Sequence, residues 1–317
     1  TTLPDSQRYL LVPEGQPVPR GLDEDVSILQ EPLQNIYLVA SGVMDMFASV
    51  DAVDQIRFSG QKQENWYIQT AKDAMAAGDM IYAGKYSKPD YELLVSEGCD
   101  LAIENRMITH SPEVVEMLQS FDIPVMIEYS SYEQHPLGKV EWVKFFGALT
   151  GKEAKAEEAF AEQTEILEEV ESGEKTGKTI AFFYVTSNGL IQVRQSTDYI
   201  PKLIELAGGR YIFENLEDSG SGRSTLNMQV EDFYAGAKDA DILIYNSSID
   251  GGVTTVDELI GKCNILKDFK AVQEGQVYCT TNDMYQQSMA IGYLLQDMHT
   301  VLTDDDTAKL RYLFLLQ

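Results

Sequence analysis

Apolar runs alternate with amphipathic segments through the first half of the chain. Segments with helical spacing lie between the strand-like runs, which occupy residues 35–41, 56–60, 100–104 and 125–129. In residues 42–56, for example, Met44, Phe47 and Val50 fall on one helical face. Strands that alternate with helices predict a mainly parallel sheet covered by helices on both faces.

The second half of the chain follows the same pattern. Strand-like runs recur at residues 178–187, 242–245 and 274–282, and a closing helix is expected from Tyr285 to Leu302. Each half also contains an aspartate that opens an apolar strand, Asp100 in "DLAI" and Asp241 in "DILI", with an acidic residue eight to ten positions earlier. This similarity predicts two α/β lobes of related design.

A long helical pattern separates the two halves. It begins at Pro136, and its aromatic residues recur at helical spacing, while Gly147 and Gly151 predict a kink or break. We expect an N-terminal lobe in residues 1–138, a linking backbone helix in residues 139–174 and a C-terminal lobe in residues 175–317.

Composition narrows the class of protein. A chain of 317 residues is long enough for two domains, and 44% hydrophobic residues are ample for packed cores. The net charge of −27 argues against a nucleic-acid partner, and no apolar run approaches the roughly 18 residues of a membrane span. Cys99, Cys263 and Cys279 have no CxxC spacing and are expected to be buried small hydrophobes.

Two stretches carry a resemblance to a known family. They are "PDYELLVSEGCDLAI" and "IPVMIEYSSYEQHPLGKVEWVKFFGALTGKEAKAEEAF". With them the chain resembles, over nearly its whole length, the substrate-binding proteins of ABC importers for siderophores, haem and cobalamin. The resemblance implies two lobes joined by one long helix, a ligand cleft between them and delivery of the ligand to a membrane permease. It also implies an extracytoplasmic monomer, either a lipoprotein with a leader upstream of Thr1 or a free periplasmic protein.

Aromatic and polar residues follow the predicted strands or lie in the loops beside them. Ligands of open parallel sheets gather beyond the carboxyl ends of the strands. We expect the ligand-binding residues to be Trp66, Tyr86, Arg106, Met107, Tyr129, Tyr132, Arg194, Arg223, Asn246 and Tyr285. Arg106 either pairs with a structural carboxylate or faces the ligand, and Arg223 lies in a Gly/Ser loop that either cradles an anion or is solvated.

The ligand class is expected to be a metal chelate. Aromatic side chains with one or two arginines suit a large, flat or anionic chelate. The histidines are only His110, His135 and His299, too few and too dispersed for a site that binds a bare metal ion. We expect a ferric siderophore, with haem or a cobamide as the alternatives, and no resident cofactor. His135 either caps the long helix or acts as an axial ligand.

An enzyme remains the other class of function. Glu104 and Glu128, at the ends of neighbouring strands, are candidates for the general acid and base of a carboxylate-dependent hydrolase. No Ser-His-Asp set, P-loop, GxGxxG or HExxH motif accompanies them. A binding protein is the favoured interpretation.

The resemblance also implies a docking glutamate near the start of a helix on each lobe. Glu92 matches in the N-terminal lobe, and Glu231 in the C-terminal lobe, with Asp232 as the alternative. These acids would pair with permease arginines. Acidic residues also favour a helix N-terminus without any partner, so both interpretations stay open.

Overall fold

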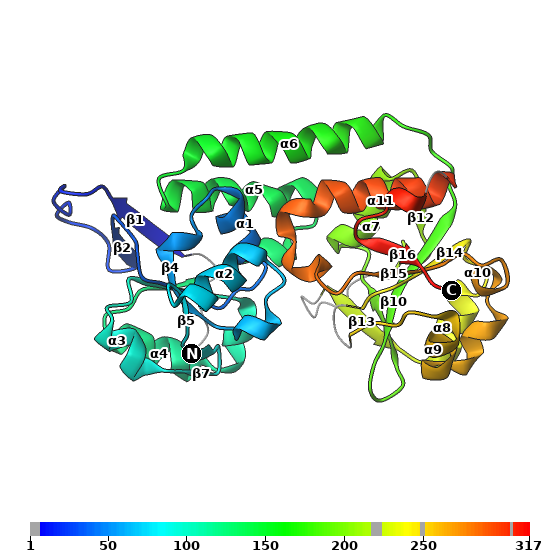
Figure 1. Ribbon diagram of the computed structural model, residues 1–317, viewed down its shortest axis with the longest axis horizontal. Coiled ribbons are helices and arrows are strands. Elements are labelled where there is room, and N and C mark those ends of the chain that lie inside the picture. The colour runs from blue at the N-terminus through cyan, green and yellow to red at the C-terminus, as the bar shows by residue number, and fades with distance from the viewer. Residues whose placement is uncertain (1–6, 217–223, 248–250, 305–306) are drawn as a thin grey trace. The chain divides into compact units, whose positions relative to one another are not determined.

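The computed structural model describes residues 7–216, 224–247, 251–304 and 307–317 (Figure 1). The chain forms two compact units, the first made of Thr1–Ser130 with Glu141–Phe160 and the second of Ser131–Val140 with Ala161–Gln317. Two of the three unit boundaries, after Val140 and after Phe160, fall within the helical segment that the sequence places between the two lobes, and the third follows Ser130.

The first unit is built on an all-parallel sheet, as the sequence predicts. Its strand order is β5-β4-β3-β8-β9. The strands are β3 (Ile36–Leu38), β4 (Ile56–Ser59), β5 (Ile81–Tyr82), β8 (Leu101–Glu104) and β9 (Val125–Ile127). The helices are α1 (Val43–Ser49), α2 (Gln69–Ala77), α3 (Tyr91–Ser96) and α4 (Pro112–Ser120). Leu94 of α3 and Val114 and Leu118 of α4 pack with Tyr37 and Ala102 of the sheet in one apolar cluster.

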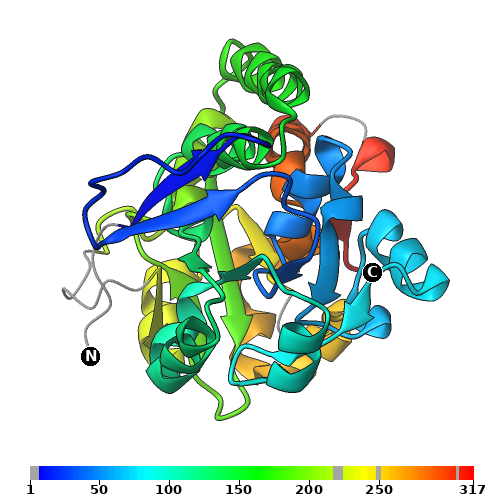
Figure 2. The ribbon, with the colours of Figure 1, turned by 90° about the vertical axis from the view of Figure 1, so that its left-hand side faces the viewer.

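Two smaller strand pairs complete the first unit. The parallel strands β1 (Arg8–Val12) and β2 (Val26–Gln30) run side by side (Figure 2). Gln7 Oε1 accepts a hydrogen bond from the Ile127 N–H, and the Tyr9 hydroxyl donates to the Val125 carbonyl. These contacts satisfy the outer backbone groups of β9, which would otherwise be an open sheet edge. β6 (Gly84–Lys85) and β7 (Lys88–Pro89) form a short antiparallel hairpin.

The second unit has a mixed sheet in the order β13-β11-β10-β14-β15-β16, with β12 also paired to β10. The strands are β10 (Thr179–Val185), β11 (Ile191–Arg194), β12 (Arg210–Tyr211), β13 (Thr225–Met228), β14 (Ile242–Tyr245), β15 (Val277–Thr280) and β16 (Leu313–Leu315). β10, β12, β14 and β15 are mutually parallel, whereas β11, β13 and β16 run antiparallel to their neighbours.

Helices and aromatic side chains cover this second sheet. The helices are α7 (Tyr199–Leu206), α8 (Val230–Ala237), α9 (Val256–Lys262), α10 (Lys270–Gln273) and α11 (Ile291–Thr303). Phe233 of α8 lies between Phe183 of β10 and Phe269, with ring centroids 4.9 and 5.5 Å away. Cys263 and Cys279 are buried in the same cluster, which confirms their prediction as small hydrophobes.

The two matching aspartates do the same structural work in each unit. Asp100 Oδ2 accepts hydrogen bonds from the backbone N–H groups of Gln34 and Asn35, directly before β3. Asp241 Oδ2 accepts from the N–H and hydroxyl of Thr179, at the start of β10. Each carboxylate thus ties the start of its own strand to the start of the neighbouring parallel strand. This contact explains the aspartate that opens both apolar strands.

The linking helix is not continuous. Residues 136–171 form two helices, α5 (Pro136–Leu149) and α6 (Glu153–Glu171), which reverse direction and pack side by side (Figure 1). The Lys144 ammonium lies 4.0 Å from the centroid of the Phe160 ring. A Cβ on Gly147 would lie only 2.4 Å from the Ala156 Cβ, so glycine permits the close approach of the helices. The expected single helix at residues 139–174 is therefore wrong, and the break predicted near Gly147 and Gly151 is confirmed.

Candidate functional site

Glu104 ends β8, at the carboxyl end of the first sheet. Its side chain is fully buried, and neither carboxyl oxygen has a hydrogen-bond partner among the described residues. Because side chains alternate along a strand, Glu104 shares a face with Ala102 and the apolar cluster around Tyr37. Burial raises the pKa of the Glu104 carboxyl to about 8. The group is therefore neutral near pH 7 and able to donate a hydrogen bond.

Glu128 follows the neighbouring strand β9 and has a different environment. Its Oε2 accepts hydrogen bonds from the Ser130 N–H at 2.8 Å and from the Ser130 hydroxyl at 2.6 Å. The Glu128 carboxylate is thus held in a local turn. The acid–base pair of the hydrolase interpretation consists of one isolated buried carboxyl and one that is bound to its own loop.

Several residues predicted to bind the ligand follow the adjacent strands β8 and β9 in the chain. Arg106 begins a short 3-10 turn (Arg106–His110) just after β8, and the side chain of the next residue, Met107, is 49% exposed. Tyr129 is half-buried and packs on the apolar cluster, whereas Tyr132 is 42% exposed and belongs to the second unit.

Tyr86 lies in the tight turn between β6 and β7. Its ring is half-buried against the apolar cluster. The Tyr37 hydroxyl donates to the Gly84 carbonyl at 2.9 Å and so anchors the hairpin to the sheet. Gly84 has a positive φ of 89°, and a Cβ there would lie 2.3 Å from the Lys88 carbonyl oxygen. Glycine is therefore required for the turn that presents Tyr86.

Trp66 is not a surface residue. The side chain is fully buried, and its indole N–H donates to the Ser59 hydroxyl at 3.0 Å. The expectation that Trp66 offers contact surface is wrong in this structure. Its polar sequence neighbourhood suggested an exposed loop, but the large ring fills the interior next to the end of β4.

Hydroxyl and amide groups occupy the carboxyl ends of the parallel strands in the second unit. Asn246 follows β14, is 3% exposed, and donates its backbone N–H to the Phe183 carbonyl. Ser247 donates its N–H to Thr280 Oγ1 and its hydroxyl to the Thr280 carbonyl, which links the ends of β14 and β15. Thr281 follows, and its Oγ1 is buried without a partner among the described residues.

Tyr285 lies in the 3-10 turn Met284–Gln286 beyond β15. Its side chain is 39% exposed, and its hydroxyl accepts a hydrogen bond from the buried Gln286 amide. The predicted position of Tyr285 near a strand end agrees with the structure. The sequence interpretation missed Ser247, Thr280 and Thr281, for which the only signal was hydroxyl residues directly after apolar strands.

Arg194 does not lie at the carboxyl end of the sheet. It ends β11, which is antiparallel to β10, so the register places it beside Phe182 in the middle of β10. Its guanidinium lies 3.4 Å from the buried Asp198 carboxylate and 5.7 Å from the Phe182 ring centroid. These contacts make Arg194 a structural residue. Arg223, the other predicted arginine of this unit, lies outside the described residues.

His135 precedes α5, and its Nδ1 accepts a hydrogen bond from the Leu137 N–H at 3.2 Å. This confirms the predicted capping role, because the bond satisfies a free N–H group of the first helical turn. The predicted docking acids are all exposed: Glu92 lies in the first turn of α3, and Glu231 and Asp232 in that of α8.

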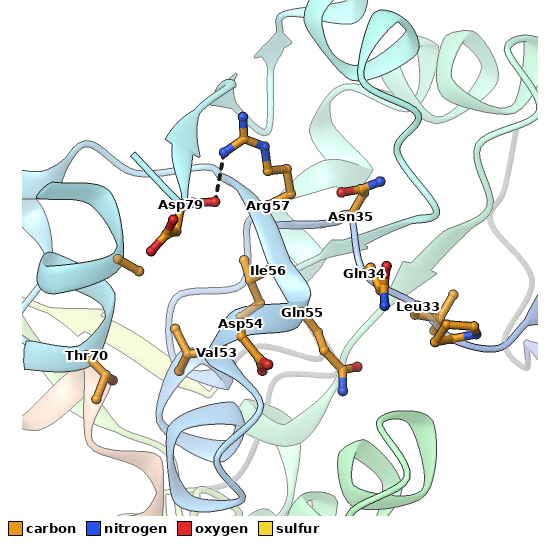
Figure 3. Close-up of a pocket in the computed structure, with 12 residues that line it drawn as sticks. Leu33, Gln34, Asn35, Val53, Asp54, Gln55, Ile56, Arg57, Thr70 and Asp79 are labelled. Carbon is orange, nitrogen blue, oxygen red and sulfur yellow. Dashed lines mark hydrogen bonds between the residues drawn. The ribbon is translucent and has the colours of Figure 1, made fainter. Parts of the chain in front are cut away.

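A pocket of about 720 Å³ opens at the amino ends of the strands of the first sheet, beside β3 and β4. Figure 3 shows Arg57 donating to the Asp79 backbone carbonyl, and the same guanidinium pairs with Glu97 at 2.8 Å. The polar side chains of Gln34 and Asp54 complete the rim. Since ligands of parallel sheets bind beyond the carboxyl ends, this pocket is not the candidate ligand site.

Buried polar atoms without a hydrogen-bond partner point to the carboxyl ends of the strands as the candidate ligand site. Among the described residues, the buried side-chain oxygens without a partner are both oxygens of Glu104, Gln195 Oε1 and Thr281 Oγ1. The Glu104 and Thr281 atoms lie at carboxyl ends of parallel strands, one site in each unit. Buried polar groups normally have partners, so a water or a ligand is the expected complement. None of the described helices is long and apolar enough to cross a membrane.

Known proteins are similar to this chain in sequence and in fold. An uncharacterized lipoprotein of Methanocaldococcus jannaschii is 25% identical over 314 residues, which cover 93% of this chain and 72% of that protein. A possible iron-binding (periplasmic solute-binding) protein from Staphylococcus epidermidis has a TM-score of 0.65 at 16% identity, with 85% of this chain and 98% of that chain covered. The periplasmic heme binding protein of Vibrio cholerae has a TM-score of 0.66 at 14% identity, covering 84% and 98% of the two chains.

At these identities the solved structures are similar in fold alone. A family model described as periplasmic binding protein matches residues 39–284, well over half of the chain. The two α/β units, their parallel strands and the polar strand ends agree with that match. The protein therefore belongs to the periplasmic binding protein family.

Proposed function

We propose that this protein is the extracytoplasmic substrate-binding component of an ABC importer and that it captures an iron complex, a ferric siderophore. Members of the family are substrate-binding proteins of transport systems rather than enzymes. Similar folds include a possible iron-binding protein and a heme binding protein, and these names favour an iron-containing ligand.

The observation that carries this proposal is the location of the orphaned buried oxygens. Glu104 in one unit and Thr281 in the other are buried without a hydrogen-bond partner, and both lie where ligands of parallel sheets bind. Tyr86, Tyr129 and Met107 add apolar surface around the first of these strand ends. A few polar groups without a hydrogen-bond partner, set beside apolar surface, are typical of a small-molecule binding site.

A thermal-shift screen tests the proposal. The protein is mixed with ferric siderophores, haemin and cobamides, each with its iron-free or metal-free counterpart as a control. A ligand at about 100 times its dissociation constant should add about 2.7 kcal/mol of stability. A shift with haemin or a cobamide alone contradicts the siderophore, and the absence of any shift contradicts the import function.

Docking on a membrane permease follows from the same proposal. Glu92 and Glu231 are exposed in the first turns of α3 and α8, where they are available to permease arginines. A Glu92→Lys/Glu231→Lys double variant should keep its ligand affinity, lose uptake, and bind the permease less well, with the largest loss at low salt. Normal uptake by this variant contradicts docking. Lysine at Glu158 and Glu274, which are also exposed, provides the charge-matched control.

The proposed location is the outer face of a membrane, through a lipid anchor on a leader upstream of Thr1. The lipoprotein relative supports this proposal. Expression of the full-length gene and separation into membrane and soluble fractions tests it. Recovery in the membrane fraction that is lost when the leader is removed is expected, whereas a gene product that starts at Thr1 contradicts the anchor.

A further inference from the structure

The parallel-strand ends of the second unit carry almost no charge. Asp283 is the sole charged residue in the described segments 186–190, 246–247, 251–255 and 281–290, which follow β10, β14 and β15. Lysine, arginine and histidine are absent from these segments. An anionic ligand would therefore find no compensating side-chain charge in these segments.

The polar side chains at the strand ends of the second unit are mainly hydroxyl and amide groups. Ser247 and Thr280 hydrogen-bond to each other, and the Gln286 amide to Tyr285, so these side chains have set orientations. The buried Thr281 hydroxyl is the orphan of this set. Hydroxyls and amides both donate and accept, so they match neutral carbonyl, hydroxamate and hydroxyl groups of a ligand.

The strand ends of the first unit do not supply a positive field either. Four cations follow the parallel strands, in residues 60–65, 83–92, 105–110 and 128–130, and five carboxyl groups in these segments or at the end of β8 oppose them. They are Lys62, Lys85, Lys88 and Arg106 against Glu64, Asp90, Glu92, Glu104 and Glu128. In its neutral form Glu104 offers a hydrogen-bond donor and no charge, and in its ionised form it repels an anion. With a net charge of −27 on the whole chain, a polyanionic chelate is repelled at long range.

From these charges we infer that the protein selects an uncharged iron chelate of the hydroxamate type over anionic catecholate chelates and haem, and that the Thr281 hydroxyl hydrogen-bonds the ligand. This inference rests on the proposed function and specifies the substrate class of the same site. The sequence predicts a large, flat or anionic chelate because aromatic residues and one or two arginines were expected to bind it. Of the three candidate arginines, Arg194 is paired with Asp198 and Arg223 lies outside the described residues.

Calorimetric titration of the intact chain with three probes tests the charge selection. Ferrichrome is an uncharged ferric trihydroxamate, ferric enterobactin is a trianionic tricatecholate, and haemin carries anionic propionates. Ferrichrome should bind at least about tenfold more tightly than either anion at low salt. Its affinity should change by less than about twofold between about 20 mM and 500 mM NaCl, whereas any catecholate binding should strengthen as salt screens the repulsion.

A Thr281→Val variant tests the hydroxyl. The substitution keeps the shape of the side chain, and the loss of one ligand hydrogen bond should weaken ferrichrome binding by roughly tenfold. Thr303→Val is the matched control. The Thr303 hydroxyl donates to the His299 carbonyl within α11, and Thr303 is the last residue of that helix, whereas Thr281 precedes the helix. The control should bind ferrichrome like the unmodified protein.

Each outcome decides between the claims. Equal or tighter binding of ferric enterobactin or haemin overturns the uncharged class and leaves the importer function intact. An unchanged affinity in Thr281→Val overturns the role of that hydroxyl. Failure of all three chelates to bind overturns the proposed iron ligand, and this inference with it.

Discussion

The two units of this protein share one hydrogen-bonding arrangement at the start of their parallel strands, but they have different polar side chains at the carboxyl ends of those strands. Asp100 and Asp241 tie neighbouring parallel strands together through equivalent hydrogen bonds to backbone N–H groups. At the opposite end of the strands, β8 finishes with the buried carboxyl of Glu104, whereas Asn246 and Ser247 follow β14 and Thr281 follows β15. The shared arrangement builds the fold, and the unequal strand ends are where specificity is expected to reside.

The difference has an energetic side. The hydroxyl groups of Ser247 and Thr280 in the second unit satisfy one another and are inexpensive to bury. Glu104 in the first unit is isolated and must bind a proton to remain buried. A fold keeps such a costly group where function requires it, which makes Glu104 the most informative residue of the comparison.

The largest expected effect is that of Glu104→Met on stability. Burial raises the pKa of Glu104 from the ordinary glutamate value to about 8. At any pH above the ordinary value, keeping this carboxyl buried therefore lowers the free energy of unfolding. Met removes the carboxyl at similar volume and should stabilise the protein by about 3 kcal/mol at pH 7. The gain should grow from near pH 4.5 up to about pH 8 and then level off. Urea denaturation across this pH range measures it.

Glu128→Met is the control in the neighbouring strand. It leaves the Ser130 N–H and hydroxyl without their acceptor, so it should destabilise the protein by about 1–3 kcal/mol. If Glu104→Met is also destabilising and its effect does not vary with pH, the Glu104 carboxyl has a partner and the contrast between the strand ends fails.

Alanine at Asp100 or Asp241 should have the next largest effect. Each substitution removes charge-assisted hydrogen bonds to the neighbouring strand and should cost about 2 kcal/mol of unfolding free energy. Although burial opposes ionisation of Asp241, hydrogen bonds from Lys270 and Thr179 hold the pKa of its carboxyl below the ordinary value. The stabilisation by Asp241 is therefore present at neutral pH and is lost as the pH falls through that lowered pKa.

Similar costs at the two aspartates would support an equivalent role in both units. Chemical denaturation of the two single variants at pH 7 and in acid makes the measurement. A cost at one aspartate and none at the other would show that the units are not built alike.

A smaller effect is expected at the hairpin that presents Tyr86. Gly84→Ala places a Cβ 2.3 Å from the Lys88 carbonyl oxygen at a positive φ of 89°. The matched control is Gly78→Ala, with a similar φ of 83° and nothing within 4 Å. Gly84→Ala should cost about 1 kcal/mol more than Gly78→Ala and should weaken ligand binding, because the turn must shift. Equal costs and unchanged binding would remove the hairpin from the site.

Much of the fold could be predicted because it depends on local patterns. Alternating strands and helices, and the aspartates that open matching strands, indicate two α/β units from the sequence alone. The antiparallel direction of β11 could not be predicted, because an apolar strand has the same alternation in either direction. Arg194 was assigned to the wrong part of the sheet for this reason.

The site was harder to predict than the fold. Trp66 follows polar residues, yet tertiary packing buries it completely. The same limit applies to the long helix, since a glycine-containing break predicts a kink but not that α6 folds back on α5 through the contact of Gly147 with Ala156. Glu104 was visible as an acid at the end of an apolar strand, but its lack of partners is a property of the packed structure.

The most direct test of the central claim is equilibrium dialysis of the intact protein against radioiron-loaded ferrichrome, followed by release and identification of the chelate. The claim that the protein captures an uncharged iron complex predicts stoichiometric retention of iron and recovery of the chelate unchanged. Retention should be lost when unlabelled ferrichrome competes. Failure to retain iron, or recovery of a cleaved chelate, would contradict it.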